Sequence, residues 1–239
     1  MQDIYKRTEM LIGSDGLKKL QDSKVAIFGL GGVGGICAEA LARSGVGNLT
    51  IIDRGMVAPS NLNRQIIATT HTIGSNKTSA MADRIRSISP NCNVNEIKMF
   101  FLMGDTDEFI FSDYDYIIDA VDVIFAKIQI AVLAKEANIP LISVMGTGNR
   151  LDPTKVRVGD LFDTTYCPLC RFMRKKLRRR GITSLNAVYS EEHETKPQTI
   201  MFTDAGKSIP ASMMFVPSAA GLAAASFVVR ELIKNKELS

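Results

Sequence analysis

Short apolar runs alternate with longer stretches of helical periodicity through the first 150 residues. The apolar runs predict strands at 24–29, 48–53, 94–98, 114–119 and 139–146. The stretches between them predict helices at 32–44, 76–87 and 123–138. Strands that are apolar on both faces are typical of a parallel sheet covered by helices on both sides. We therefore predict an α/β fold, Rossmann-like, with a doubly wound and mostly parallel sheet.

The rhythm changes after residue 150. The pattern there predicts a short edge strand at 156–158, a helix over the basic run 171–180, a strand at 187–190, a loop at 191–194, and a loop with a packed helix at 216–236. No internal repeat or low-complexity linker divides the sequence. We therefore expect a single domain over 1–239, with a nucleotide-binding core at 1–150 and a C-terminal strand and helix extension at 151–239.

Composition excludes several classes of protein. Hydrophobic residues make up 46% and charged residues 23% of the 239, as in ordinary soluble proteins, and a net charge of +4 is not that of a polycation. The first residues lack the apolar core of a signal peptide, so we expect a cytoplasmic protein. The apolar run 209–229 is just long enough to span a bilayer, but it contains Pro210 and Pro217. A buried helix is favoured over a membrane segment.

A glycine-rich turn joins the first predicted strand to the first predicted helix. Asp53 lies 19 residues after its last glycine, near the spacing at which a carboxylate meets a ribose hydroxyl. The glycines that we assign to nucleotide binding are Gly29, Gly31, Gly32 and Gly34. Glycines let the backbone approach phosphates, while helix-terminal N–H groups supply partial positive charge. The turn does not decide which nucleotide is bound.

A polar segment beyond Asp53 addresses that choice. Attack on the α-phosphorus of ATP builds negative charge on the phosphates, and losing one fixed donor typically costs about 2.7–4 kcal/mol. The residues that we assign to the phosphates are Asn61, Asn63, Arg64, Gln65 and Lys77. Singly, each has an alternative interpretation as part of a solvated loop. Together they favour ATP-dependent adenylation over binding of a redox dinucleotide.

Two carboxylates close the strand that ends at 119. We assign Asp122 to Mg²⁺, which prefers oxygen ligands and substrate phosphates, and Asp119 to a structural role at the nucleotide site. A carboxylate at this position can also cap the following helix.

The four cysteines form no disulfide scaffold at this length. Cys167 and Cys170 form a CxxC pair, but structural zinc needs four ligands and the sequence holds no second pair. We therefore do not expect zinc. A redox role is not favoured either, because the pair does not lie on the first turn of a thioredoxin-like unit. Cys37 and Cys92 are interpreted as packing residues.

The segment 171–180 holds seven Lys or Arg residues in ten positions and no acid. One interpretation is a solvated helix face. The other, which we favour, is contact with the phosphate backbone of RNA. The candidate nucleic-acid residues are Arg171, Arg174, Lys175, Arg178 and Arg179.

These residues resemble the ubiquitin-activating-type ATP-dependent adenylating family, which includes ThiF and MoeB proteins. The resemblance implies that the glycine turn and Asp53 hold adenosine and ribose, that Asn61, Arg64, Gln65 and Lys77 bind the phosphates, and that Asp122 binds Mg²⁺. It implies further that Arg7 reaches the ATP of a partner subunit, so that the enzyme is a homodimer. The catalytic set would then be Arg64, Lys77, Asp122 and Arg7.

Within that family the chain resembles the branch of tRNA threonylcarbamoyladenosine dehydratases. The matching segments are 152–154, 168–169 with the basic helix after it, 188–192 and 215–221. This branch implies ATP-dependent cyclisation of the modified adenosine through an acyl-adenylate, with the 151–239 extension contacting substrate or a second subunit. Three alternatives remain open: adenylation of a small sulfur-carrier protein with a sulfur-transfer partner, an NAD-dependent oxidoreductase, and a non-catalytic nucleotide sensor.

Overall fold

A mostly parallel sheet of seven strands forms the centre of the computed structural model, which describes residues 4–99, 109–165, 167–203, 206 and 208–234. In spatial order the strands are β3 (Asn93–Ile97), β2 (Asn48–Ile52), β1 (Lys24–Phe28), β4 (Tyr116–Asp119), β5 (Leu141–Val144), β7 (Asn186–Ser190) and β6 (Val156–Asp160). All neighbours pair in parallel except β6 and β7. The predicted doubly wound α/β fold is confirmed, and β6 is the edge strand expected at 156–158.

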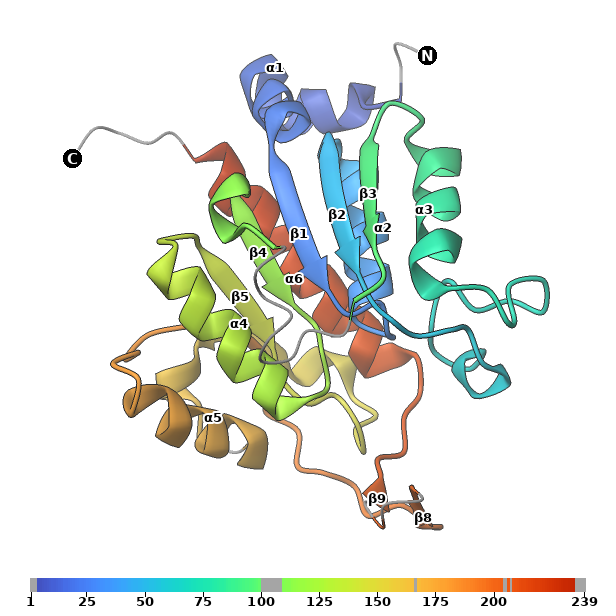
Figure 1. The fold of residues 1–239 in the computed structure, drawn as a ribbon, viewed down its shortest axis with the longest axis vertical. Helices are drawn as coiled ribbons and strands as arrows, with labels where there is room; N and C mark the ends of the chain where they lie inside the picture. The colour runs from blue at the N-terminus through green and yellow to red at the C-terminus, as the bar shows by residue number, and fades with distance from the viewer. Residues whose placement is uncertain (1–3, 100–108, 166, 204–205, 207, 235–239) are drawn as a thin grey trace.

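Helices cover both faces of this sheet (Figure 1). One face carries α2 (Gly34–Ser44), α3 (Lys77–Ile88) and α6 (Phe215–Ile233), and the other carries α4 (Ile124–Glu136) and α5 (Pro168–Arg178). The central strand explains the two layers, because successive side chains of a strand point to opposite faces. Val25 and Ile27 pack into the first core, whereas Ala26 and Phe28 pack into the second.

Two elements were not predicted from the sequence. Helix α1 (Lys6–Asp22) lies at the amino ends of the strands, at the top of Figure 1. Strands β8 (Met201–Phe202) and β9 (Ser208–Ile209) form a separate antiparallel pair at the other end of the molecule. The remaining elements are short 3-10 helices at Pro59–Asn61, Phe111–Asp113, Pro153–Lys155 and Leu161–Asp163.

The C-terminal helix packs as a core element. Among the described residues, α6 is the one helix long and apolar enough to cross a membrane. Its Val216, Ala220, Ala224 and Val228 nevertheless belong to the protein interior, and all but Val216 lie in the same hydrophobic core as α2 and β1. The expectation of a packed helix near 216–236 is therefore confirmed, with β9 occupying the start of the apolar run.

Candidate functional site

A cavity of about 560 Å³ opens at the carboxyl ends of the central parallel strands. The chain order along the sheet reverses between β1 and β4, and open α/β sheets bind ligands at such a switch point. The predicted site residues that line the cavity are Gly29, Gly31, Gly32, Asp53, Arg64, Gln65, Lys77 and Asp122. The fold thus brings residues from several separate loops to one place.

The glycine turn is held close to the loop that follows β4. Gly29 has φ +90°, and a Cβ there would lie 2.8 Å from the carbonyl oxygen of Ala120. A Cβ on Gly34 would lie 1.8 Å from the carbonyl oxygen of Gly29, so no side chain fits at the start of α2. This contact brings the backbone of the turn and the amino end of α2 to the cavity, where N–H groups attract phosphate.

Asp53 supports the same turn from the end of β2. Its Oδ2 accepts a hydrogen bond from the backbone N–H of Leu30 at 2.7 Å, and its Oδ1 accepts one from Gly55 at 2.7 Å. A carboxylate offers about four acceptor positions, so capacity remains for a ribose hydroxyl. The residue therefore shapes the turn as well as lining the cavity.

Two fixed cations contribute to the cavity wall. Lys77 is the first residue of α3, and its Nζ lies 4.0 Å from Oδ2 of Asp53. Arg64 donates through one guanidinium nitrogen to the carbonyl oxygen of Ser60 and to Oδ1 of Asn63, both at 2.9 Å. Beside Arg64, the buried Oε1 of Gln65 has no hydrogen-bond partner among the described residues. An orphaned acceptor at a cavity wall fits a site that a ligand completes.

Two residues predicted to contact the nucleotide hold the loop together in this structure. Asn61 is buried, and its Oδ1 accepts from the N–H of Ala58 at 3.0 Å. Asn63 donates to the carbonyl oxygen of Ser212 at 2.9 Å, which ties the phosphate-side loop to the C-terminal segment. Neither side chain lines the cavity, and nor does Gly34. Short amides satisfy nearby backbone groups readily, which is the physical reason for these contacts, and phosphate binding by either amide stays a prediction.

The two carboxylates after β4 differ. Asp119 is fully buried, pairs with Lys127 at 2.9 Å and accepts from Ser143, so it does not line the cavity. Asp119 thus has the structural contacts expected of it, but it lies behind the cavity wall. Asp122 is exposed and lines the cavity. The described residues contain no cluster of three metal-ligating side chains, but Mg²⁺ on a nucleotide needs only one or two carboxylates beside the phosphates. Asp122 fits that requirement.

Sequence reasoning missed other parts of the wall. Arg54 and Lys127 both line the cavity, as does the loop Gly146, Thr147 and Gly148 after β5. Arg54 directly follows Asp53 at the end of β2, and this position could have identified it as a residue of the site. Lys127 is buried against Asp119 and offered no such signal, because a lysine within a helix usually faces water.

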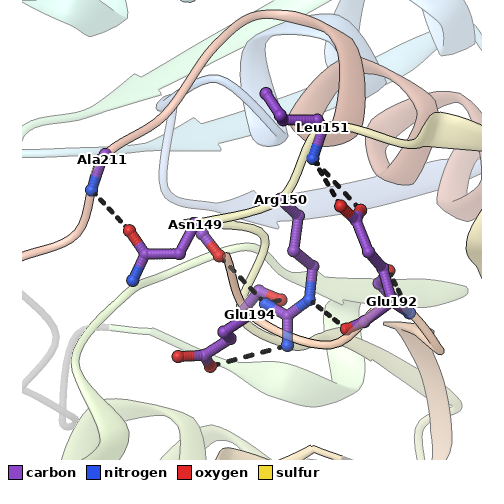
Figure 2. Close-up of polar contacts among 9 residues, drawn as sticks. Asn149, Arg150, Leu151, Glu192, Glu194 and Ala211 are labelled. Atoms are coloured by element: carbon purple, nitrogen blue, oxygen red, sulfur yellow. Dashed lines mark hydrogen bonds and ion pairs between the residues drawn. The ribbon is translucent and has the colours of Figure 1, made fainter. Parts of the chain in front are cut away.

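Arg150 holds the loop after β5 in place. Its side chain is buried, and its guanidinium donates to the carbonyl oxygens of Gly146 at 2.9 Å, Gly148 at 3.1 Å and Glu192 at 3.2 Å. Figure 2 shows this guanidinium also facing Glu194, with 3.6 Å between the charged groups. The arginine thus fixes a cavity wall through backbone oxygens.

The neighbouring Asn149 holds a second wall in place. It has a left-handed backbone with φ +58°, and its Oδ1 accepts from the N–H of Ala211 at 2.8 Å (Figure 2). Its own N–H donates to the carbonyl oxygen of Ala211 at 2.7 Å. Because Pro210 and Ser212 line the cavity on either side of Ala211, this pairing joins the two walls.

The remaining candidates lie outside the cavity. Four candidate cations are exposed on α5 and at its C-cap: Arg171, Lys175, Arg178 and Arg179. Arg174 is partly exposed and donates to the carbonyl oxygens of Leu161 and Thr164, so it makes a structural contact, and its role toward nucleic acid stays a prediction. Arg7 is exposed on α1, at the end of the sheet away from its own cavity.

Comparisons with known proteins agree with this geometry. The model of the ThiF family matches residues 5–236. The tRNA threonylcarbamoyladenosine dehydratase of Bacillus subtilis is 38% identical to this chain, and the match covers 98% of this chain and 96% of the Bacillus protein. The dehydratase of Escherichia coli is 33% identical to this chain, and the match covers 92% of this chain and 85% of the E. coli protein.

Solved structures are similar over the same span. The crystal structure of the E. coli dehydratase TcdA with AMP superposes with a TM-score of 0.88 at 31% identity, covering 97% of this chain and 94% of that chain. The structure of TcdA with ATP gives the same TM-score at 30% identity.

Proposed function

Because the chain belongs to the ThiF family, we propose that it uses ATP to dehydrate threonylcarbamoyladenosine in tRNA through an acyl-adenylate. The observation that carries the proposal is the cavity itself. It combines the glycine turn, Arg64, Lys77 and Asp122 in a chain that is similar from end to end to a dehydratase solved with ATP and with AMP.

In the first step the carboxylate of the threonylcarbamoyl group attacks the α-phosphorus of ATP. The bond from that phosphorus to the bridging oxygen breaks, and pyrophosphate leaves. Arg64, Lys77 and the N–H groups at the start of α2 stabilise the charge that builds on the phosphates. Bound Mg²⁺ would neutralise part of the same charge, and Asp122 is the carboxylate that would hold it.

In the second step a nitrogen or oxygen of the same side chain attacks the activated carbonyl carbon. The bond to AMP breaks, the attacking atom loses its proton, and the net change is the loss of one water. Ring closure within one molecule needs mainly positioning, which can contribute about 7–11 kcal/mol. Ring closure by an atom of the substrate itself needs no covalent enzyme intermediate, so we assign no Cys or His to the reaction.

The active form that we propose is a cytoplasmic homodimer in which Arg7 reaches the ATP of the second subunit. Support comes from the exposure of Arg7 and from the place of α1 at the amino ends of the strands, opposite the carboxyl ends that carry the cavity. Mixing Arg7→Ala subunits with Lys77→Ala subunits tests this. Recovery of activity in the mixture is expected, because one of the two sites in each mixed dimer is then intact. No recovery would contradict a shared site.

The substrate is tested by pyrophosphate release. The protein with Mg-ATP should release pyrophosphate on addition of tRNA that carries threonylcarbamoyladenosine, and not with the same tRNA lacking that modification. The Lys77→Ala variant is the control for enzyme-dependent release. Release that depends on a small sulfur-carrier protein, and is indifferent to tRNA, would instead favour carrier adenylation with a sulfur-transfer partner.

A further inference from the structure

The cysteine pair lies at the start of a helix beside the cavity. Cys167 is the N-cap residue of α5, Pro168 occupies the first helical position, and Cys170 occupies the third. Both cysteines are free and buried, and the N-cap and third helical positions place them one turn apart on the same helix. The two sulfurs are therefore close neighbours at a helix terminus, a position that favours a thiolate.

A buried positive charge also acts on Cys167. The buried guanidinium of Arg150 is held by the carbonyl oxygens of Gly146 and Gly148 and faces Glu194 (Figure 2), and its charge acts on this sulfur. Interaction with the Cys170 thiol, reinforced by backbone N–H groups and Arg150, outweighs burial and lowers the pKa of Cys167 below that of an ordinary thiol. The same contact and burial raise the pKa of Cys170, although Thr164 and Arg174 oppose them.

The other two cysteines are internal controls. Burial raises the pKa of Cys37 to about 12 and that of Cys92 to about 11. Both belong to the hydrophobic core on the face of the sheet that carries α2 and α3, whereas Cys167 and Cys170 belong to the core on the opposite face. Burial raises the pKa of these two thiols, whereas the surroundings of Cys167 lower its pKa, so Cys167 differs from them in its environment.

We propose that Cys167 and Cys170 form a peroxide-reactive dithiol that closes to a reversible disulfide. The thiolate of Cys167 attacks one oxygen of hydrogen peroxide, the O–O bond breaks, and a sulfenic acid and one water result once the leaving hydroxide gains a proton. The sulfur of Cys170 then attacks the Cys167 sulfur and expels the hydroxyl as a second water. Two thiols lose two electrons and two protons, and one peroxide becomes two waters.

The disulfide would alter the nucleotide cavity. Leu169, between the two cysteines, lines that cavity, and Arg150 holds Gly146 and Gly148 in its wall. Oxidation replaces a thiolate beside Arg150 with a neutral sulfur and draws the first turn of α5 together. We expect a several-fold weaker affinity for ATP in the oxidised protein. This consequence rests on the proposed function, whereas the disulfide does not.

The test uses the reduced full-length protein treated with a small excess of hydrogen peroxide, followed by alkylation of remaining thiols and peptide mapping. The expected product has lost two hydrogens, about 2 Da, in a 167–170 disulfide that dithiothreitol reverses. The Cys170→Ser variant should stop at a sulfenic acid on Cys167, which dimedone traps, and Cys37→Ser should oxidise like the parent. Arg150→Met should slow the reaction several-fold, with folding checked by circular dichroism.

Two outcomes would overturn the proposal. One is a folded protein whose Cys167 and Cys170 stay reduced under excess peroxide. The other is oxidation of all four cysteines at equal rates. Fluorescence-detected ATP binding before oxidation, after oxidation and after dithiothreitol tests the coupling to the cavity separately. An unchanged dissociation constant would overturn that coupling, and it would not bear on dehydration by the reduced enzyme.

Discussion

The ammonium of Lys77 lies 4.0 Å from Oδ2 of Asp53, within ion-pair distance but beyond a hydrogen bond. Both oxygens of Asp53 already accept backbone N–H groups of the loops around the cavity. Lys77 is therefore kept at the cavity wall by charge without being held in a short contact. This arrangement leaves its three N–H donors available to phosphate oxygens.

Replacing either cavity cation should slow adenylation far more than it changes stability. We expect Lys77→Ala or Arg64→Ala to lower the rate of AMP formation in a single turnover by about 10²–10³, the effect of removing one transition-state donor. The matched control is Arg86→Ala, an exposed arginine of α3 that pairs with Glu96 away from the cavity. A rate for Lys77→Ala within a factor of about three of the parent would contradict the assignment.

The glycine turn offers a pair of variants that differ in one contact. A methyl group on Gly34 would meet the carbonyl oxygen of Gly29, whereas one on Gly31 would meet nothing within 4 Å. Gly34→Ala should therefore lower the free energy of unfolding by about 3 kcal/mol or more, the upper range of overpacking. Gly31→Ala should fold normally and alter only ATP affinity. Equal stability of the two variants in urea titrations would refute this explanation of the turn.

The buried pair of Asp119 and Lys127 should behave as a structural unit. Lys127→Met leaves a carboxylate buried with only Ser143 and the N–H of Val121 as donors among the described residues, and such losses cost about 3–5 kcal/mol. The double variant Asp119→Asn, Lys127→Met should be clearly more stable than Lys127→Met alone. Chemical denaturation of the ligand-free proteins measures both. A double variant less stable than either single one would exclude the pairing as the cause.

The exposed cations of α5 should govern tRNA affinity without affecting ATP. Reversing the charges of Arg171, Lys175 and Arg179 should weaken tRNA binding and reduce its salt dependence, by a slope of about 0.7–0.9 for each phosphate that is no longer neutralised. Reversal of Lys18, Lys24 and Arg86, on other surfaces, is the charge-matched control. If both triple variants lose the same tRNA affinity, the overall charge of the protein governs binding, and the cations around α5 do not form a binding face.

The sheet and its helices could be predicted because their side chains follow the periods of buried elements. Helix α1 could not, since only Gly16 and Leu20 of its 17 residues are buried and Gly13 interrupts it with φ +76°. Strands β8 and β9 could not be predicted either, because each has only two residues, both exposed, and so shows no alternation of apolar and polar side chains.

The candidate site was predictable where side-chain type alone decides the role. Glycines beside a helix start and cations after a strand suit phosphate in any such fold, and most of these residues do line the cavity. Asn61 and Asn63 were harder, because an amide serves the backbone as readily as a ligand. Arg150 was missed because its partners are carbonyl oxygens of its own loop and of the segment that begins near Glu192.

The cavity at the carboxyl ends of the strands should activate the carboxylate of a modified tRNA nucleoside. The most direct measurement incubates the protein with Mg-ATP and tRNA bearing threonylcarbamoyladenosine, then weighs the digested nucleosides by mass spectrometry. We predict a nucleoside lighter by one water, formed only with ATP and lost in Arg64→Ala. An unchanged nucleoside mass, from protein that is folded and binds ATP, would contradict the proposed dehydration.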